Sequence, residues 1–355
     1  MNPVVTKMKT SSGNFFEDFS LGQVIHHATP RTITEGDVSL YSALYGTRFA
    51  VQSAESFAKA IGYPRAPVDD LLVFHIVFGK TVPDISLNAV ANLGYAACRF
   101  LAPVYPGDTL HAVSEVIGLR ENANRTSGVV YVRSTGFNQH GKEVLDYARW
   151  VMVRKRNEHG AAPEPLVPQL PSAIPAEGLG ASVPALHLRE YNFRLAGSEH
   201  RFEDYTPGEK IDHVDGMTVE EAEHQIATRL YQNTAKVHFN QFAQKSDRFG
   251  KRLIYGGHVI SLARALSFNG LANAFHVAAI NGGRHVAPLF AGDTVFAWSE
   301  VLDAQELPHR SDVGALRLRM VATKDRPCTD YPHKNGDEYE PGVILDLDYW
   351  VLIPR

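Results

Sequence analysis

A histidine follows an asparagine by five positions in the segment LYQNTAKVHFN, residues 230–240. Imidazole titrates near neutral pH, so His238 can both accept and deliver a proton. Asn233 cannot accept a proton, but its amide oxygen can hold a water and its NH₂ group can hold a substrate. We therefore predict acid–base chemistry on a bound water, with His238 as the acid/base and Asn233 as the orienting residue. A hydrogen-bonded structural histidine and a helix-end asparagine are the alternative interpretations.

Two adjacent glycines open an apolar segment in YGGH, residues 255–258. Glycine lets a ligand approach the backbone closely, and the N–H groups at the start of a helix stabilise negative charge. Gly256 and Gly257 are therefore expected to hold the oxygen of a substrate on which charge develops. A plain loop-to-helix turn is the alternative.

The His238 segment has a degenerate counterpart early in the chain. LYGTRFAVQSA, residues 44–54, carries Thr47 and Gln52 where the later segment carries Asn233 and His238. The glycine pair is likewise replaced by Asp69 and Asp70. Carboxylates at a helix start would cap the helix but would repel a developing oxyanion. The earlier segment is therefore predicted to be non-catalytic.

The same correspondence extends over most of the chain. FEDFSLGQVIHH (16–27) returns as FEDYTPGEKIDH (202–213), and PGDTLHAVSEVIG (106–118) returns as AGDTVFAWSEVLD (291–303). YARWVMV (147–153) is echoed by LDYWVLI (347–353). Matches in the same order predict two copies of one fold. We expect an N-terminal domain at 1–156, a Pro/Ala-rich linker at 157–200 and a catalytic domain at 201–355. The composition of the linker predicts an extended chain rather than a part of the core.

Each copy shows helical segments followed by strands. Helices are expected at 34–45 and 220–231, and buried apolar segments at 71–79 and 258–268. Alternating apolar and polar residues then predict three strands per copy. The fold class is therefore α+β, with an antiparallel sheet wrapped around a central helix in each copy. Asp108 and Asp293, in the two GDT triplets, are interpreted as turn residues because both copies have them.

These segments resemble the MaoC-like (R)-specific enoyl-CoA hydratases. That family's motif G-D-x-N-P-x-H corresponds to QNTAKVH (232–238), and its later H-G start of the central helix corresponds to YGGH. FHIVFGKTVPD, HVDGMTVEEAEH and GGHVISLARALSFNGLANA look like the mesaconyl-CoA (β-methylmalyl-CoA) hydratase branch. The chain departs from the motif, since Asn233 stands for the aspartate and Ala235-Lys236 for Asn-Pro. The resemblance implies a tandem hot-dog fold.

The resemblance also implies reversible hydration of a branched, carboxylated enoyl-CoA. The substrate carboxylate would need a cation, and Arg284, Lys236 and Arg229 are the candidates. His258, His276 and His285 are interpreted as structural. A hot-dog acyl-CoA thioesterase and a non-catalytic acyl-CoA-binding protein are the open alternatives, because the fold alone does not decide function.

Composition limits the other partners. The 355 residues carry a formal charge of −4, with no Lys/Arg run, which argues against nucleic acid or an anionic membrane as partner. No apolar run has membrane-spanning length and the N-terminus lacks a signal core, so a cytoplasmic protein is expected. No metal-ligand spacing or phosphate loop is seen, so no cofactor or metal is expected. A homo-oligomer, most simply a dimer, is expected.

Overall fold

The computed structural model describes residues 9–308 and 310–355. The first part of the N-terminus, in which no signal core was found, lies outside these residues. The N-terminal copy comprises η1 (Phe16–Asp18), β1 (Val24–His26), β2 (Arg31–Thr32), α1 (Glu35–Tyr45), α2 (Ala50–Ser53), α3 (Glu55–Ala60), α4 (Asp70–Thr81), η2 (Val82–Ser86), β3 (Ala89–Phe100), β4 (Thr109–Glu121), β5 (Ser127–Phe137) and β6 (Glu143–Arg154).

The linker contains η3 (Ala176–Gly178), η4 (Leu188–Glu190) and α5 (Phe193–Ala196). The C-terminal copy comprises η5 (Phe202–Asp204), β7 (Lys210–Thr218), α6 (Glu221–Leu230), α7 (Lys236–Phe239), α8 (Gln241–Gln244), α9 (Gly256–Leu266), α10 (Phe268–Leu271), β8 (His276–His285), β9 (Thr294–Glu306), β10 (Val313–Lys324), β11 (Lys334–Asn335), β12 (Glu338–Tyr339) and β13 (Val343–Pro354).

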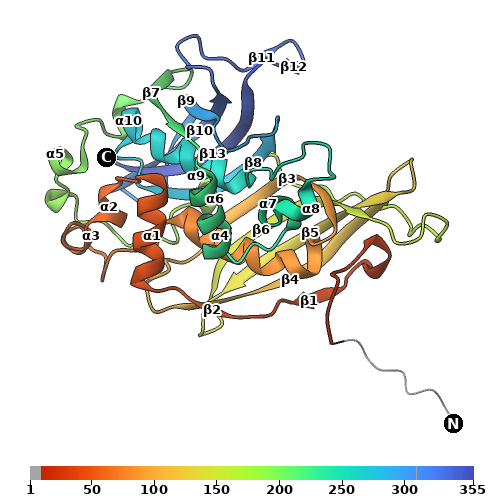
Figure 1. Ribbon diagram of the computed structural model, residues 1–355. Helices are drawn as coiled ribbons and strands as arrows, with labels where there is room; N and C mark the ends of the chain where they lie inside the picture. The colour runs from red at the N-terminus through yellow and green to blue at the C-terminus, as the bar shows by residue number, and fades with distance from the viewer. Residues whose placement is uncertain (1–8, 309) are drawn as a thin grey trace.

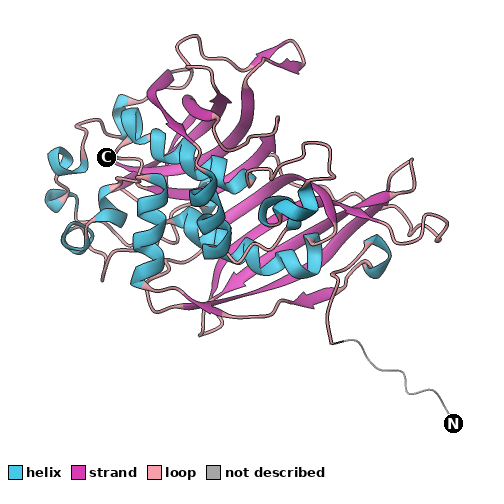
Figure 2. Cartoon of the chain, in the orientation of Figure 1, coloured by secondary structure: helices cyan, strands magenta, loops and turns pink. Residues whose placement is uncertain are grey.

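The two copies share one continuous antiparallel sheet. Its order is β1-β4-β5-β6-β3-β8-β13-β10-β9-β7, so the second half repeats the first in reverse. Strands β3 and β8 meet in the middle, with Tyr95 opposite Gly283 and Cys98 opposite Ile280. Helices α1, α4, α6 and α9 gather on one face of this sheet (Figures 1 and 2). The predicted α+β class and paired strands are confirmed.

Strands β3 and β8 were not among the strands expected from the sequence. Their sequences, AVANLGYAACRF and HVAAINGGRH, are rich in alanine and glycine, which have little β-propensity. They form strands because each is held on both sides, by the neighbouring copy and by β6 or β13. Tertiary pairing therefore overrides the local preference at the centre of the sheet.

The central helices α4 and α9 are apolar on nearly all sides and are buried along almost their whole length. They begin 186 residues apart and pack about a pseudo-two-fold axis. The hydroxyls of Tyr45 and Tyr231, equivalent residues in the repeat, lie 2.6 Å apart. His75 on α4 likewise contacts Ser261 on α9 across the same offset, at 2.9 Å. The two copies therefore pair like the subunits of a symmetric dimer.

The second half of the linker, from Ile174 onward, contributes to the core, so the expectation of an extended linker rather than core is wrong for that part. Its prolines interrupt regular structure, but the apolar residues between them remain free to bury. They pack against α3 and against residues of β8, β10 and β13, in a cluster that includes Ile174, Leu179, Val183, Leu186, Tyr191 and Phe193. Trp350 of β13 donates its indole N–H to the carbonyl of Ile174 at 3.0 Å.

Within the part of the chain that the structure describes, no helix combines the length and apolar character needed to cross a bilayer.

Candidate active site

The segment that carries Asn233 and His238 rests on the central helix of the other copy. Gly79 of α4 allows this contact, because a Cβ at that position would lie 1.8 Å from the carbonyl oxygen of Tyr231. Gln232 follows in the left-handed region, with φ of 53°, which costs free energy in a non-glycine residue. Its side-chain oxygen accepts a hydrogen bond from Lys80 of α4. The N-terminal copy thus holds the turn that positions the motif.

Asn233 is buried at the end of this turn, with 2% of its surface exposed. Its backbone N–H donates to the carbonyl of Thr228 at 2.9 Å. Its side-chain oxygen accepts from the N–H of Ala235 at 3.1 Å, which fixes the amide plane. The NH₂ group is therefore the part of Asn233 left to face a ligand. This refines the expected role, in which the oxygen was to hold the water.

His238 follows on the short helix α7 and is half-buried. Its Nδ1 lies 2.8 Å from the carbonyl oxygen of Leu253, so Nδ1 carries the proton and donates. Nε2 is then the unprotonated nitrogen, able to take a proton from water. Burial lowers the pKa of His238 to about 4, and the hydrogen bond to Leu253 opposes this only in part. The residue is therefore a neutral base at physiological pH.

The start of α9 lies beside this histidine. The Tyr255 ring centroid is 5.5 Å from that of His238, and α9 begins at the next residue without a side-chain cap among the described residues. A Cβ on Gly256 would lie 2.4 Å from the ring of His285, and one on Gly257 would lie 2.4 Å from the ring of Tyr255. The glycines therefore let the rings of His285 and Tyr255 pack closely against the start of α9, where the first N–H groups have no partner within the helix.

Histidines concentrate around this helix start. The ring centroids of His224 and His238 are 6.1 Å apart, and those of His224 and His258 are 5.5 Å apart. Burial lowers the pKa of His224 to about 2, of His75 and His258 to about 3, and of His285 to about 4. All are neutral and serve as hydrogen-bonding groups. His224 Nε2, for example, accepts from the N–H of Tyr255 at 2.9 Å.

The described residues contain no group of three or more His, Cys, Asp or Glu side chains arranged to hold a metal ion. The histidines instead bond to neighbours in the protein. His258 Nδ1 lies 2.7 Å from the Tyr45 hydroxyl, and His285 Nε2 lies 3.1 Å from the Tyr95 hydroxyl. His276 likewise lies 2.9 Å from Asp70 and 2.7 Å from Ser182, and the structural roles of His258 and His276 stay predictions. His285, expected to be structural as well, also lies against Gly256 in the candidate site.

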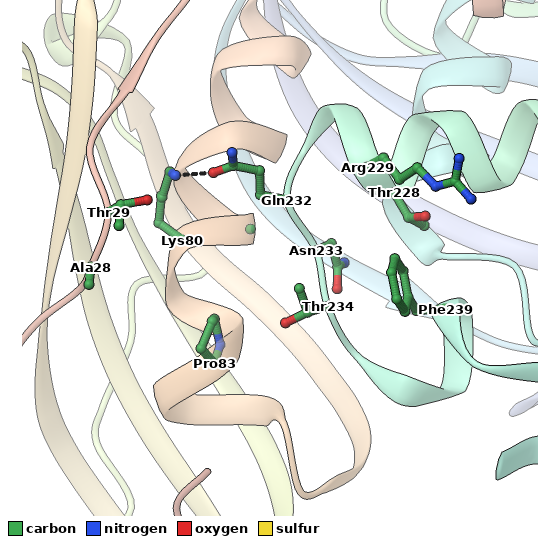
Figure 3. A pocket seen from close by; sticks show the side chains of 11 residues that line it. Ala28, Thr29, Lys80, Pro83, Thr228, Arg229, Gln232, Asn233, Thr234 and Phe239 are labelled. Atoms are coloured by element: carbon green, nitrogen blue, oxygen red, sulfur yellow. Dashed lines mark hydrogen bonds between the residues drawn. The ribbon is translucent and has the colours of Figure 1, made fainter. Parts of the chain in front are cut away.

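A pocket of about 400 Å³ opens between the two copies beside Asn233 (Figure 3). One wall comes from the N-terminal copy and the other from α6, the following turn and α7. The lining residues are Ala28, Thr29, Gly79, Lys80, Pro83, Thr228, Arg229, Gln232, Asn233, Thr234 and Phe239. Its size suits part of a small-molecule ligand.

The three cations predicted to bind a carboxylate do not come together. Arg229 is exposed at the wall of the pocket, and Lys236 is exposed at the start of α7. Arg284 lies on the opposite face of β8 from His285, because side chains alternate along a strand. Its guanidinium carbon is 5.7 Å from the centroid of the Tyr339 ring. Arg284 is therefore turned away from the histidine cluster.

Lys80 was missed in the sequence. It is 3% exposed, and burial together with the charge of Arg31 lowers the pKa of its amine to about 8. The signal was present, since a lysine interrupts the apolar run LLVFHIVFGK. A lysine within a buried helix has to meet a polar partner or a ligand. In the structure it meets Gln232 and the pocket.

In the corresponding region of the N-terminal copy, the polar side chains are hydrogen-bonded to other groups of the protein. Gln52 donates to the carbonyl of Phe275 at 2.8 Å. Asp69 caps α4 by accepting from the N–H of Leu71 at 2.9 Å, as expected. Asp70 accepts from the N–H of Val277 and lies 2.9 Å from His276 Nδ1. Helix α4 begins at Asp70 and helix α9 begins at Gly256. The residues equivalent to the glycine pair are therefore Asp70 and Leu71, rather than Asp69 and Asp70 as expected.

Comparisons with known proteins agree with this architecture. A family model described as mesaconyl-CoA hydratase matches residues 2–164. A crystal structure of a MaoC domain protein from Chloroflexus aurantiacus superposes with a TM-score of 0.96, at 62% identity, covering 98% of this chain and 99% of that one. A Mycobacterium tuberculosis protein with a double hotdog fold reaches 0.75 at 24% identity, covering 97% and 99% of the two chains.

Two curated relatives cover almost the whole chain. A beta-methylmalyl-CoA dehydratase from Chloroflexus aurantiacus is 62% identical over 349 residues, which are 98% of this chain and 99% of that protein. A mesaconyl-CoA hydratase from Cereibacter sphaeroides is 59% identical over 349 residues, which are 98% of this chain and 100% of that protein. Together with a fused pair of hot-dog folds, these matches show that the chain belongs to the mesaconyl-CoA hydratase family.

Proposed function

We propose that this protein reversibly hydrates mesaconyl-CoA to β-methylmalyl-CoA at the site around His238. The observation that carries the proposal is the placement of a neutral imidazole with a free Nε2 beside the start of α9. The names of two relatives at 62% and 59% identity support the choice of substrate. The reaction requires a base for water and a stabiliser for the thioester enolate, and the site offers both.

In the proposed hydration, the NH₂ group of Asn233 orients the water and Nε2 of His238 removes its proton. The water oxygen forms a bond to the β-carbon, and the C=C electrons move onto the thioester oxygen as an enolate. The N–H groups of Gly256 and Gly257 hold that oxygen. The imidazolium of His238 then returns its proton to the α-carbon. Dehydration follows the same steps in reverse.

The pocket between the copies fits the entrance for the acyl-CoA. Lys80 and Arg229 bring positive charge to its walls, which suits an anionic ligand. Asn233 belongs to the pocket lining and to the His238 segment, so a thioester entering here would reach the proposed base.

The test is turnover of mesaconyl-CoA by the purified protein, followed by loss of enoyl-thioester absorbance and by product mass. We expect a gain of one water without release of free CoA. Release of free CoA would instead identify a thioesterase, and tight binding without turnover would identify an acyl-CoA-binding protein.

The proposed chemistry moves only protons and water, so the proposal includes no cofactor or metal beyond the CoA of the substrate. A cytoplasmic homodimer is proposed as the working form of the protein. Sedimentation at several protein concentrations and fractionation of cells measure these two points.

A further inference from the structure

A buried arginine without a compensating acid lies on the inner face of β6. Arg149 is 0% exposed, and its guanidinium carbon is 4.2 Å from the centroid of the Phe78 ring. Its Nη2 donates to Thr81 Oγ1 at 2.7 Å. Among the described residues, Nε and Nη1 have no hydrogen-bond partner. Burial lowers the pKa of Arg149, and the groups that oppose this effect are tyrosines rather than carboxylates.

Other polar groups without partners lie on the same face of the neighbouring strands β3 and β6. Both polar atoms of the Asn92 side chain, and the hydroxyl of Tyr147, are buried without hydrogen bonds within the part of the chain that the structure describes. Tyr95 on β3 lies directly opposite Arg149 in the sheet, so their side chains share one face. The cluster offers several N–H and O–H donors, and its acceptors, such as Asn92 Oδ1 and the tyrosine hydroxyls, are uncharged. What it lacks is an anionic acceptor.

The second copy provides an internal reference. Arg149 pairs with Val132 in the sheet, and Tyr349 pairs with Leu318. Leu318 is the repeat equivalent of Val132, 186 residues later, so Arg149 and Tyr349 are equivalent as well. On the helices the exchange is reversed, because Arg264 of α9 stands where α4 has Phe78. The buried arginine therefore lies on the strand in the N-terminal copy and on the helix in the C-terminal copy.

The two buried arginines differ in their partners. Arg264 Nη1 donates to Ser267 at 3.1 Å and Nη2 donates to the carbonyl of Ala274. The charges of Asp69 and Asp70 also act on Arg264. Burial of a charge without a partner is strongly unfavourable, so the arrangement at Arg149 calls for an anion that is not part of the protein.

Aromatic side chains connect this cluster to the proposed active site. The Tyr95 hydroxyl contacts His285, whose ring covers Gly256. The Phe78 ring centroid lies 5.7 Å from that of Tyr255, which in turn packs on His238. In a mesaconyl thioester the free carboxylate is attached to the β-carbon, the atom that water attacks. A carboxylate site beside the acid/base is therefore what such a substrate requires.

We propose that Arg149 and Asn92 bind the free carboxylate of the substrate, so that the N-terminal copy sets the preference for carboxylated enoyl thioesters. The inference rests on the proposed function and names the recognition site for that substrate class. It replaces Arg284, Lys236 and Arg229 as the cation for the carboxylate. Lys80 and Arg229 keep their place at the pocket mouth.

The test compares substrates with and without the carboxylate in each variant. Arg149→Met should lower kcat/KM for mesaconyl-CoA roughly a hundredfold, as expected when one partner of a buried charged pair is removed. Hydration of crotonyl-CoA, which has no carboxylate, should be unchanged or faster. Arg149→Lys should recover only part of the loss, because lysine cannot form the bidentate pair. Asn92→Leu should also lower kcat/KM for mesaconyl-CoA relative to crotonyl-CoA, but by a smaller factor than Arg149→Met.

Two variants separate this role from structural and entrance roles. Arg264→Met removes a buried arginine of the other copy and should lower thermal stability while leaving the ratio of the two kcat/KM values unchanged. Lys80→Met should lower kcat/KM for mesaconyl-CoA and for crotonyl-CoA by the same factor. Arg149→Met should unfold at or above the wild-type temperature, because it removes an uncompensated buried charge.

Binding of saturated thioesters tests the site without turnover. Calorimetry should show that wild type prefers succinyl-CoA over butyryl-CoA and that Arg149→Met loses this preference. A retained preference in both Arg149→Met and Asn92→Leu would overturn the inference, as would an equal loss for both substrates. If wild type hydrates neither mesaconyl-CoA nor crotonyl-CoA, the proposed function fails, and the binding result still decides the role of Arg149.

Discussion

The region around His238 and the region around Gln52 are built from equivalent helices and turns, but their side chains make different contacts. Around His238, a short helix presents a histidine whose Nδ1 is hydrogen-bonded to Leu253, and two glycines begin α9. Around Gln52, the side-chain NH₂ is tied to Phe275, and two acids occupy the start of α4. His276 bridges Asp70 and Ser182 of the linker, at 2.9 and 2.7 Å.

Under the proposed function, the N-terminal copy has no reaction of its own but supports that of the C-terminal copy. Its helix α4 supports the Asn233 turn through Gly79 and Lys80, and its sheet supplies Tyr95 and Arg149. The linker meanwhile packs against the Gln52 region, where Ser182 bonds to His276 and linker residues share a hydrophobic cluster with Val51 and Phe275. The two halves therefore divide the proposed work: one supplies the acid/base, and the other supplies support and recognition.

The largest effect is expected from replacing His238, and a much smaller one from replacing the equivalent residue Gln52. His238→Ala should lower kcat/KM for mesaconyl-CoA by roughly 10²- to 10⁴-fold, the range for loss of a general acid/base. Gln52→Ala should leave it within a factor of about three, because only a structural hydrogen bond is lost. Steady-state kinetics on both variants measure this. Equal losses would mean that both regions are catalytic.

The two helix starts should respond differently to an added or removed side chain. Gly256→Ala brings a methyl group within 2.4 Å of the His285 ring, so ring and helix must separate. A fall in kcat of roughly 10²-fold is expected, as for loss of one oxyanion donor. Asp70→Ala, at the equivalent position, should lower the unfolding temperature and leave kcat near wild type. Full activity of Gly256→Ala would argue against an oxyanion site there.

The pH profile should report the buried environment of His238. Its pKa is lowered to about 4, and the neutral form is the base, so activity is present above this pH and lost below it. We expect kcat/KM to fall about tenfold per pH unit below pH 4, rather than below the usual histidine value near 6.5. Circular dichroism at each pH controls for unfolding. An acid limb near 6.5 would show that another group titrates.

A smaller effect is expected on stability in the N-terminal copy. Burial, with a contribution from Asp70, raises the pKa of Asp69 to about 6. The favourable contribution of its protonated form is thus present below pH 4 and lost as the pH rises through 6. Asp69→Asn keeps the helix cap and should stabilise the fold by about 1 kcal/mol at pH 7.5, after allowance for partial exposure.

The stabilisation by Asp69→Asn should vanish below pH 4, where wild-type Asp69 is already neutral. Chemical unfolding at pH 7.5 and pH 4 measures both values, and Asp215→Asn, at an exposed position, serves as the control. A gain of equal size at both pH values would contradict the assigned cause.

Much of this organisation could be predicted from the sequence. The repeat gave the two copies, and the alternation of apolar residues gave three strands in each. Strands β3 and β8 could not be recognised, because their alanines and glycines form strands only through the pairing that the fold creates. The packing of the linker depends equally on surfaces that exist only in the folded protein.

The proposed recognition residue did leave a sequence signal. In β6, every second residue faces the core, and Arg149 interrupts the series Leu145, Tyr147, Val151 and Val153. A charge at an inward position of a strand is a candidate ligand-binding residue by its pattern alone. What the sequence could not show is that Nε and Nη1 of its guanidinium have no hydrogen-bond partner among the described residues, since this depends on every neighbouring chain segment.

The exchange of arginine and aromatic residue between Phe78–Arg149 and Arg264–Tyr349 carries a consequence for how such a site could arise. In an assembly of two identical chains, every substitution occurs twice, once in each half. A change that opened one site to a carboxylate would equally alter the other, and an acid that sealed one helix start would seal both. Joining the halves into one polypeptide lets each position change once, so one pocket can specialise while the other is given up.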